Sequence, residues 1–247
     1  MPNQFLSGEG DLENYFITEY WLIDQWVGDT LWTWGSNSYG QLGDGTTTQR
    51  LTPVTTLSGG TKWKQVAAGG FLSLAIKTDG TLWGWGYNVN GQLGTNDTVT
   101  RSTPVTTFLG GTNWKQVSCG DGHTVAIKTD GTLWTWGRNN YGQIGENTST
   151  SRCTPVTTFA GGTNWKQVAC GRYFAAAIKT DGTLWTWGRN YNGQLGINSS
   201  YVSSIQTNNR SIPVTTFAGG TNWKQVSCGD GHTVAVTSGT DPTYFIS

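Results

Sequence analysis

A repeat of about 51 residues runs through almost the whole chain and limits what it can fold into. The string LWTWG, or its variant LWGWG, starts every 51 residues, at Leu31, Leu82, Leu133 and Leu184. The string WKQV starts at Trp63, Trp114, Trp165 and Trp223, with steps of 51, 51 and 58 residues. Seven extra residues in the segment 197–210 account for the longer last step. The chain is therefore built from four copies of one unit, and the architecture must be one in which units stack.

Each unit contains four short apolar segments, as in LWTWG, PVTTF, WKQV and HTVAIKT. The proline of PVTTF suits the start of a strand, where a missing N–H donor is tolerated. Asp-Gly pairs such as Asp130-Gly131 indicate tight hairpins, because these turns need a positive φ. Apolar residues on both faces of such short strands require a like neighbour on each side of every sheet, and no unit can bury its tryptophans alone. The sequence predicts an all-β fold, a β-propeller of about four blades, closed by terminal strands or by oligomerisation.

The chain divides into an N-terminal leader and a repeat body. Residues 1–29 contain six acidic residues and no Lys or Arg, so we expect an acidic anchor that docks on its own body or on a neighbouring subunit, or a solvated terminus. The body, residues 30–247, is divided into the units 30–80, 81–131, 132–182 and 183–239 and a closing tail, 240–247. The leader string YWLIDQWVGD can form a hairpin with the first LWTWG strand, and the tail TDPTYFIS can add one strand, so either could close the ring.

Charge and hydropathy exclude several classes of protein. The start of the chain has neither a basic nor an apolar region of the kind found in a signal peptide. No stretch of about 18 apolar residues is present, which argues against membrane insertion. Fifteen Lys and Arg balance fifteen Asp and Glu, so no nucleic-acid partner is expected.

The residues that could carry catalysis do not assemble into a recognisable set. His123 and His232 occupy the same repeat position, where another unit has Phe174, so we interpret them as structural. Three of the four cysteines also share one repeat position, which indicates small buried side chains rather than disulfides or zinc ligands. We therefore predict a protein that is not an enzyme and has no catalytic, metal or cofactor site.

The candidate site is instead an interaction surface. One arginine lies three residues before the proline in every unit: Arg50, Arg101, Arg152 and Arg210. Either each arginine braces its own loop, or the four together form a partner-binding ring. The glycine-rich loops after LWTWG vary from unit to unit in residue types that dominate protein-binding hot spots: Tyr39, Tyr87, Arg138, Tyr141, Arg189 and Tyr191.

The ordered motifs WKQV, CGDGHT, LWTWG and GQLG resemble the repeat of the regulator of chromosome condensation family over about residues 30–239. The resemblance implies a propeller of four-stranded blades, usually seven, whereas this chain has four units. It also implies an intracellular regulator, acting by guanine-nucleotide exchange on a small GTPase or by chromatin binding. The leader LENYFITEYWLIDQWVGD is similar, over one short stretch, to segments that precede such repeats in virion proteins of tailed bacteriophages.

We expect a binding or structural protein, first of all a phage virion-associated protein of the capsid decoration, tail or fibre type. Its partners would be other virion proteins or a host-surface receptor, and it could form a homo-oligomer. The alternative is the intracellular regulator, located in the cytoplasm, and a second alternative is a carbohydrate-binding lectin.

Overall fold

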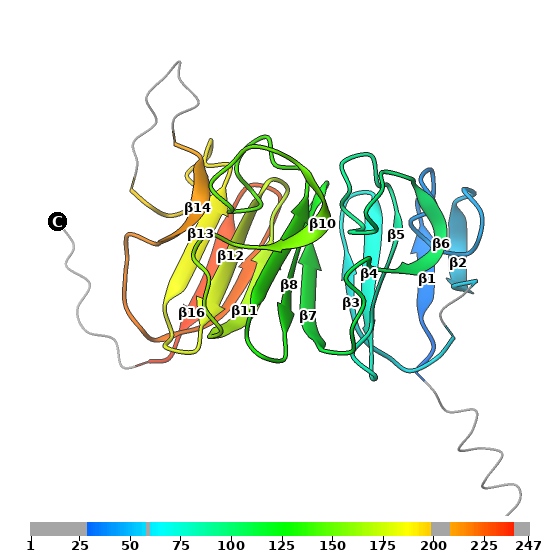
Figure 1. Cartoon of the computed structure of the whole chain (residues 1–247), viewed down its shortest axis with the longest axis horizontal. Coiled ribbons are helices and arrows are strands. Elements are labelled where there is room, and N and C mark those ends of the chain that lie inside the picture. The colour runs from blue at the N-terminus through cyan, green and yellow to red at the C-terminus, as the bar shows by residue number, and fades with distance from the viewer. Residues whose placement is uncertain (1–28, 58–59, 199–207, 240–247) are drawn as a thin grey trace, which may run out of the picture.

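The structure is a computed structural model that describes residues 29–57, 60–198 and 208–239. These residues form sixteen β-strands and no helix, gathered into five antiparallel sheets. The sheets lie side by side along the longest axis of the molecule, with β1 and β2 at one end and β15 and β16 at the other (Figure 1). The expectation of an all-β, propeller-type stack is confirmed.

Three of the sheets have four strands each, ordered as in the chain. The first consists of β3 (Trp63–Ala68), β4 (Leu72–Lys77), β5 (Leu82–Gly86) and β6 (Arg101–Thr106). The second consists of β7 (Trp114–Cys119), β8 (His123–Lys128), β9 (Leu133–Gly137) and β10 (Arg152–Thr157). The third consists of β11 (Trp165–Cys170), β12 (Phe174–Lys179), β13 (Leu184–Gly188) and β14 (Arg210–Thr215).

The two end sheets have two strands each. One pairs β1 (Trp32–Gly35) with β2 (Arg50–Thr55), and the other pairs β15 (Trp223–Cys228) with β16 (Thr233–Thr237). A complete sheet begins with the WKQV strand and ends with the proline-containing strand, so each takes two strands from one sequence unit and two from the next. By this order β1 and β2 are a third and a fourth strand, whereas β15 and β16 are a first and a second strand.

Local sequence explains the hairpins and the outer strands. Gly131 has a φ of 79°, and the Asp130 carboxylate accepts hydrogen bonds from the Thr132 amide (2.9 Å) and hydroxyl (2.7 Å). The fourth strand begins at its arginine, three residues before the proline that was predicted to open it. Because this strand forms the sheet edge, the proline inside it removes no necessary ladder hydrogen bond.

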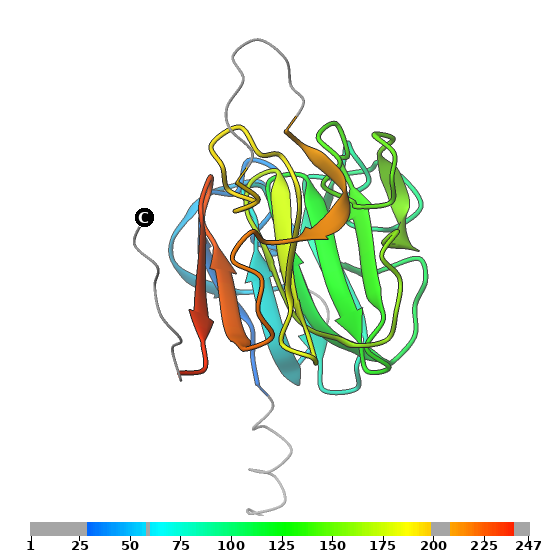
Figure 2. The ribbon, with the colours of Figure 1, turned by 90° about the vertical axis from the view of Figure 1, so that its left-hand side faces the viewer.

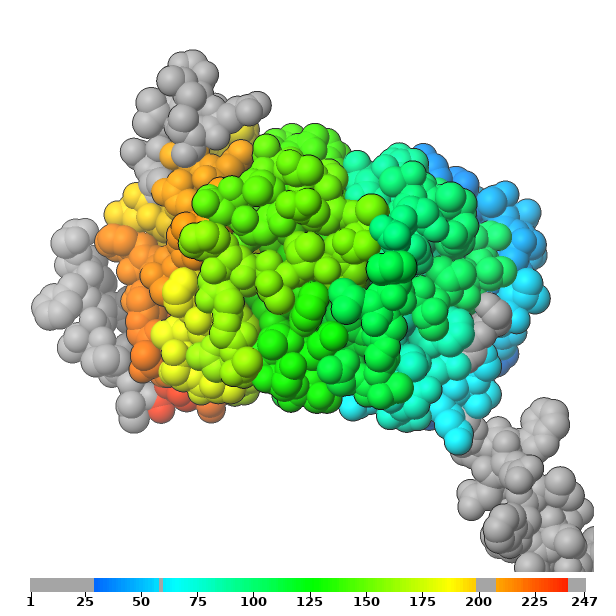
Figure 3. Space-filling model, in the orientation of Figure 1, coloured from blue at the N-terminus to red at the C-terminus, as the bar shows by residue number. Residues whose placement is uncertain are grey.

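The core lies between neighbouring sheets rather than inside any one of them. The cluster between the first two complete sheets joins Leu74 and Ile76 of β4 to Trp114 of β7 and Trp136 of β9, all almost fully buried. The rings of Trp114 and Trp136 meet nearly edge to face, 5.9 Å apart. Each sheet therefore depends on the next one for burial of its indoles, and the sheets form one continuous body (Figure 3).

The terminal strands predicted to close the ring lie outside the described residues, since residues 1–28 and 240–247 are not among them. In the described part of the chain no helix is long and apolar enough to cross a membrane. Figure 2 shows the β15–β16 hairpin at the near end of the stack, with no other described sheet in front of it.

Candidate interaction surface

The loops that follow the third strands share a rigid framework. In each loop a buried asparagine accepts a hydrogen bond from a backbone amide five residues later, as Asn88 does from Leu93 at 2.9 Å. Its amide group also donates to the far side of the loop, to the carbonyls of Asp97 at 3.1 Å and Val99 at 3.2 Å. A glutamine four residues after this asparagine holds the loop tip, as Gln92 does by accepting a hydrogen bond from the Asn90 amide at 2.9 Å. The residues between these anchors are thereby held outward in one conformation.

Aromatic side chains from two of these loops form a first cluster with a hairpin turn. Tyr39 lies 4.7 Å from Tyr87 and 5.3 Å from Phe71, measured between ring centroids. Phe71 comes from the β3–β4 turn and lies 6.2 Å from Tyr87. Tyr39 and Phe71 are 38% and 42% exposed, so the cluster is open to a partner.

A second cluster combines tyrosines with arginines. The guanidinium groups of Arg138 and Arg172 lie 5.3 and 5.1 Å from the ring centroid of Tyr173. Arg189 lies 5.5 Å from Tyr141 and 5.3 Å from Tyr191 in the same measure. A guanidinium group stacked on a ring presents its hydrogen-bond donors at its edge, which suits recognition of carboxylates and carbonyls.

Ion pairs connect the turns of successive sheets. Arg172, in the β11–β12 turn, contacts Asp121 of the β7–β8 turn at 2.7 Å and Asp230 of the β15–β16 turn at 3.6 Å. The hydrogen bond to Asp121 raises the pKa of Arg172 above its usual value, so the group stays charged. A hollow of about 200 Å³ between the two clusters is lined by Tyr87, Arg138 and Tyr173, among others. We name the whole surface the Tyr–Arg strip: Tyr39, Phe71, Tyr87, Asp121, Arg138, Tyr141, Arg172, Tyr173, Arg189, Tyr191 and Asp230.

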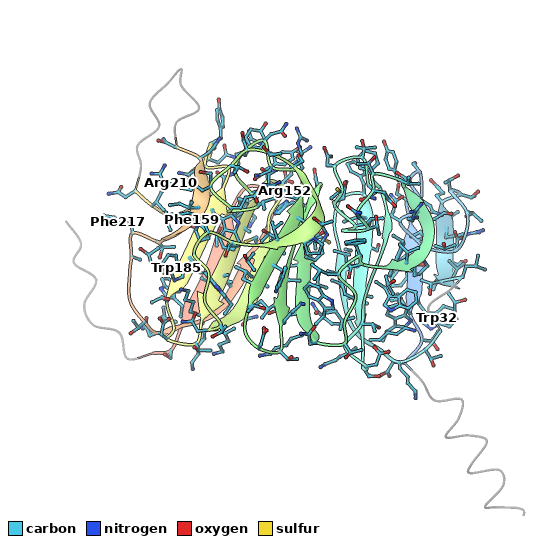
Figure 4. All side chains as sticks on the ribbon, in the orientation of Figure 1. Trp32, Arg152, Phe159, Trp185, Arg210 and Phe217 are labelled. Carbon is cyan, nitrogen blue, oxygen red and sulfur yellow. The ribbon has the colours of Figure 1, made fainter. Side chains whose placement is uncertain are left out.

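The four in-register arginines do not join the strip. Arg50, Arg101 and Arg152 each pair with an acidic residue of their own loop, at 2.6, 2.7 and 2.7 Å. Arg210 donates to the carbonyl of the adjacent Asn209 at 3.3 Å. Figure 4 shows Arg152 and Arg210 on neighbouring sheets, each at the start of its fourth strand. Three of the four charges are thus neutralised locally, in agreement with a loop-bracing role, and a partner-binding ring made from them remains a hypothesis.

A separate row of large apolar side chains follows the fourth strands. Leu57, Phe108, Phe159 and Phe217 occupy one repeat position and are 68%, 63%, 63% and 73% exposed. Phe159 and Phe217 lie at the surface in Figure 4. This row was not predicted from the sequence, although it is the last position of the repeated string PVTTF, which reads PVTTL in the first unit.

The histidine and cysteine environments do not favour nucleophilic chemistry. Burial lowers the pKa of His123 to about 4, and burial raises the pKa of Cys119 and of Cys228 to about 12. All four cysteines are free. In the described ranges no three His, Cys, Asp or Glu side chains are grouped in a way that could hold a metal ion.

Six strip residues follow from the sequence, whereas Phe71, Asp121, Arg172, Tyr173 and Asp230 were missed. They lie in the turns between the first and second strands, which read GGF, GDG, GRY and GDG in the successive units. The first and third turns depart from the GDG pattern of the other two, and this difference was the signal by which Phe71, Arg172 and Tyr173 could have been found. The pairing of the second strand with the third brings these turns beside the loops, as the Leu72–Gly86 register of β4 and β5 shows.

Comparison with known proteins identifies the family. The RCC1-like domain matches residues 26–244 of this chain. The chain belongs to the RCC1-like family. An RCC1-like relative, the ultraviolet-B receptor UVR8 of Arabidopsis thaliana, is 35% identical over 210 residues, which are 83% of this chain and 46% of the relative. The probable E3 ubiquitin-protein ligase HERC4 of Homo sapiens is 36% identical over 187 residues, 74% of this chain and 17% of the relative.

Solved structures agree with the RCC1-like fold. The structure of Prp20p from Saccharomyces cerevisiae, described with its binding properties to Gsp1p and histones, has a TM-score of 0.70 and 20% identity over 85% of this chain and 52% of that one. This RCC1-like chain therefore spans about half of that structure, and half or less of both curated relatives. The match to HERC4 covers too little of that protein to carry its ligase activity to this chain.

Proposed function

We propose that this chain is the protein-binding propeller of an RCC1-type regulator and that the Tyr–Arg strip is its contact surface. The single observation that carries the proposal is the strip itself, a run of stacked tyrosines and arginines contributed by the loops and turns of successive sheets. Tyrosine and arginine are the residue types enriched in protein-binding hot spots.

Comparison of the repeats with one another supports this surface. The asparagine and the glutamine that anchor each loop are the same in every unit, whereas the outward positions change, as from Tyr87 to Arg138. Because the framework does not depend on the outward positions, these can differ from loop to loop and offer different contacts. Since the framework holds the loops before a partner arrives, little ordering entropy is lost on binding.

The relatives suggest the class of partner. Prp20p is described as binding Gsp1p and histones, which are proteins. We infer protein partners of the same classes for this chain, with guanine-nucleotide exchange on a small GTPase and chromatin binding as the two activities to test. The virion setting and a host-surface receptor are not carried into this proposal, because none of the relatives reported above is a virion protein.

The experiment measures binding of the full chain to two probes, purified Gsp1p and reconstituted histone octamers, by biolayer interferometry. Tyr173→Ala removes the ring on which Arg138 and Arg172 stack, and we expect at least a tenfold loss of affinity. Lys115→Ala, an exposed residue on the first strand of a complete sheet, serves as the control and should bind as the wild type does. A fluorescent-nucleotide release assay on a purified small GTPase then reports exchange.

Absence of binding to both probes would contradict the proposal. Binding that is unchanged in the Tyr173→Ala variant, with its far-UV circular dichroism intact, would show that another surface makes the contact.

A further inference from the structure

The β1–β2 end of the molecule exposes side chains that are buried or half-buried at the same position elsewhere in the repeat. Trp34 is 61% exposed, whereas its counterparts Trp85, Trp136 and Trp187 are 1%, 0% and 0% exposed. Its neighbour Trp32 is 55% exposed and lies at the edge of the stack in Figure 4, whereas the counterpart Trp185 lies within it. These exposed indoles belong to a surface that the repeat normally covers with another sheet.

The β15–β16 end shows the same deficit on complementary strands. Val234 and Val236 are 59% and 53% exposed, whereas the corresponding Val125 and Ile127 of β8 are fully buried. Inside the stack every second strand pairs with a third strand, as β4 does with β5, β8 with β9 and β12 with β13. Of the strands described, β16 is the second strand that lacks a third strand, and β1 is the third strand that lacks a second.

A repeated indole hydrogen bond also stops at the ends. Trp85, Trp136 and Trp187 each donate from Nε1 to a carbonyl 44 residues earlier, at 2.9 Å in all three cases, to Gln41, Gln92 and Gln143. The next acceptor in this series is the Gln194 carbonyl, beside β16, which accepts from the Thr233 hydroxyl at 2.7 Å. By repeat position, the indole that continues the series is Trp34, at the opposite end of the molecule.

A glutamine ladder between first strands is interrupted in the same way. Gln65 of β3 bonds the Val117 backbone of β7 in both directions, at 2.7 and 2.9 Å, and Gln167 of β11 bonds the Val226 backbone of β15, at 3.2 Å in both directions. Val117 and Val226 are buried, at 1% and 3% exposure, whereas Val66 of β3 is 57% exposed. Gln225 of β15, which would continue the ladder, is exposed at the other end.

Each end also carries a hollow where the missing partner would lie. At the β1 end a hollow of about 330 Å³ is lined by Trp32, Trp34, Val66 and Leu72 together with other residues of β1, β3 and β4. At the β16 end a hollow of about 360 Å³ is lined by Gln194, Thr233 and Ala235, among others. The first hollow separates β1 from β3 and β4, and the second contains the acceptor that continues the indole series.

We propose that the two end sheets are two halves of one four-stranded sheet, completed when β16 of one copy of this chain pairs with β1 of a second copy. The paired order becomes β15–β16 of one copy followed by β1–β2 of the next, which reproduces the order of the three complete sheets. At each junction, Trp34 of the second copy donates to the Gln194 carbonyl of the first copy. Gln225 of the first copy continues the glutamine ladder onto Val66 of the second copy.

A second copy is the occupant because the chain's own ends lie far apart. The two half-sheets lie at opposite ends of the longest axis (Figure 1). Closing the chain on itself would require a much tighter curvature than the stack has. As it stands, the stack aligns with 52% of the Prp20p chain, so it has the curvature of about half of that structure. Two copies joined head to tail supply both junctions at once, and the closed ring leaves no edge strand unpaired.

The repeat predicts the register of the new strand pair. Val125 of β8 opposes Thr135 of β9, and Ala126 opposes Trp134. Transferred by repeat position, Val234 of one copy opposes Thr33 of the other, and Ala235 opposes Trp32. Thr33 and Ala235 therefore lie on opposite faces of the shared sheet, because successive side chains alternate.

The test begins with native mass spectrometry of the unaltered full chain, for which we expect a dimer. Disulfide trapping then checks the register, using Thr33→Cys with Val234→Cys in a background without native cysteines. That background borrows residues from the chain's own repeats: Ala, as at Ala68, replaces Cys119, Cys170 and Cys228, and Ser, as at Ser102, replaces Cys153. A mixture of ¹⁴N- and ¹⁵N-labelled chains distinguishes links between copies from links within one.

We expect mixed-isotope peptides in which a disulfide joins positions 33 and 234. The matched pair Thr33→Cys with Ala235→Cys should give the corresponding link in much lower yield, and this difference would support the proposal. A monomeric mass for the unaltered chain would overturn it. A link found only within single chains would overturn it equally, because the chain's own end would then be the occupant.

A disruptive variant supplies an independent check. Val234→Glu places a charge on the exposed edge strand, so we expect the dimer to be lost while the circular dichroism spectrum is unchanged. Phe108→Glu alters an equally exposed side chain, 63% exposed against 59%, on another surface and should leave the dimer intact. Loss of the dimer in both variants, or in neither, would contradict pairing through β16.

Discussion

At the scale of single residues, the same amino acid at the same repeat position has different environments. His123 is fully buried because the next sheet covers it, whereas its counterpart His232 is exposed at the end of the stack. The position accepts apolar residues as well, since Phe174 and Leu72 occupy it in the other units and are also buried. Burial therefore favours the neutral form of a histidine in this setting.

This burial makes stability depend on pH through His123. Its pKa lies near 4 in the folded protein, below the usual value of 6.5, so the unfolded chain binds the proton more tightly. The contribution of neutral His123 to stability is therefore fully present above about pH 6.5, and it is lost progressively as the pH falls from there towards 4. At pH 5 the free energy of unfolding should be lower than at pH 7.5 by about 2 kcal/mol, which urea titrations at fixed protein concentration can measure.

The matched variant for this prediction is His123→Phe, which copies Phe174 of the neighbouring unit. It removes the titrating group, and the difference between pH 7.5 and pH 5 should shrink by about the same 2 kcal/mol. Equal pH dependence in the two proteins would rule out His123 as the source. Acidic residues such as Asp130, whose pKa is lowered by the hydrogen bonds from Thr132, act only at a more acidic pH.

At the scale of structural elements, the Asp-Gly hairpins connect sheets as well as strands. The carbonyl of Gly131 accepts a hydrogen bond from the Trp165 amide of the next sheet at 3.0 Å. A Cβ atom placed on Gly131 would collide with the carbonyl of Thr163, and the φ of 79° is itself unfavourable for other residues. The turn thus needs glycine for its conformation and for the close approach of the adjacent sheet.

Gly131→Ala should therefore lower the free energy of unfolding by more than the backbone strain alone, by about 2–3 kcal/mol. Gly161→Ala is the control, because Gly161 also has a positive φ, 53°, but nothing lies within 4 Å of the added atom. We expect about 1 kcal/mol for the control. Thermal or urea unfolding measures both, and equal losses would show that contact with the next sheet contributes nothing.

At the scale of the whole molecule, a stack of sheets is stable only in proportion to its neighbour contacts, and its end sheets are the weakest members. Pairing between copies would change this ranking at both ends. In the assembled wild type, the amides of β16 should exchange slowly with deuterium, whereas in Trp34→Glu, altered at the opposite end, β16 should exchange at least tenfold faster. Peptides from β8, inside the stack, serve as the reference and should not change. Equal exchange of β16 in both proteins would contradict coupling between the ends.

Much of the fold was predictable because its signals are local. The repeated WKQV, HTVAIKT and LWTWG strings and the Asp-Gly turns specify the strands and hairpins, since alternation and turn geometry depend on residues close in the chain. The loop half of the Tyr–Arg strip, such as Arg138 and Arg189, was predictable for the same reason. The turn half, including Arg172 and Tyr173, was not, because only strand pairing brings these turns beside the loops.

What the sequence alone determined is therefore the unit: four strands of known order, apolar on both faces, repeated four times. What only the tertiary structure decided is how the units share strands, which offsets every sheet from the sequence repeat and leaves a half-sheet at each end. The burial of Trp85 and the exposure of Trp34 come from the same local motif. The difference lies in whether a neighbouring sheet is present, and that is a property of the assembled stack that no single position in the chain encodes.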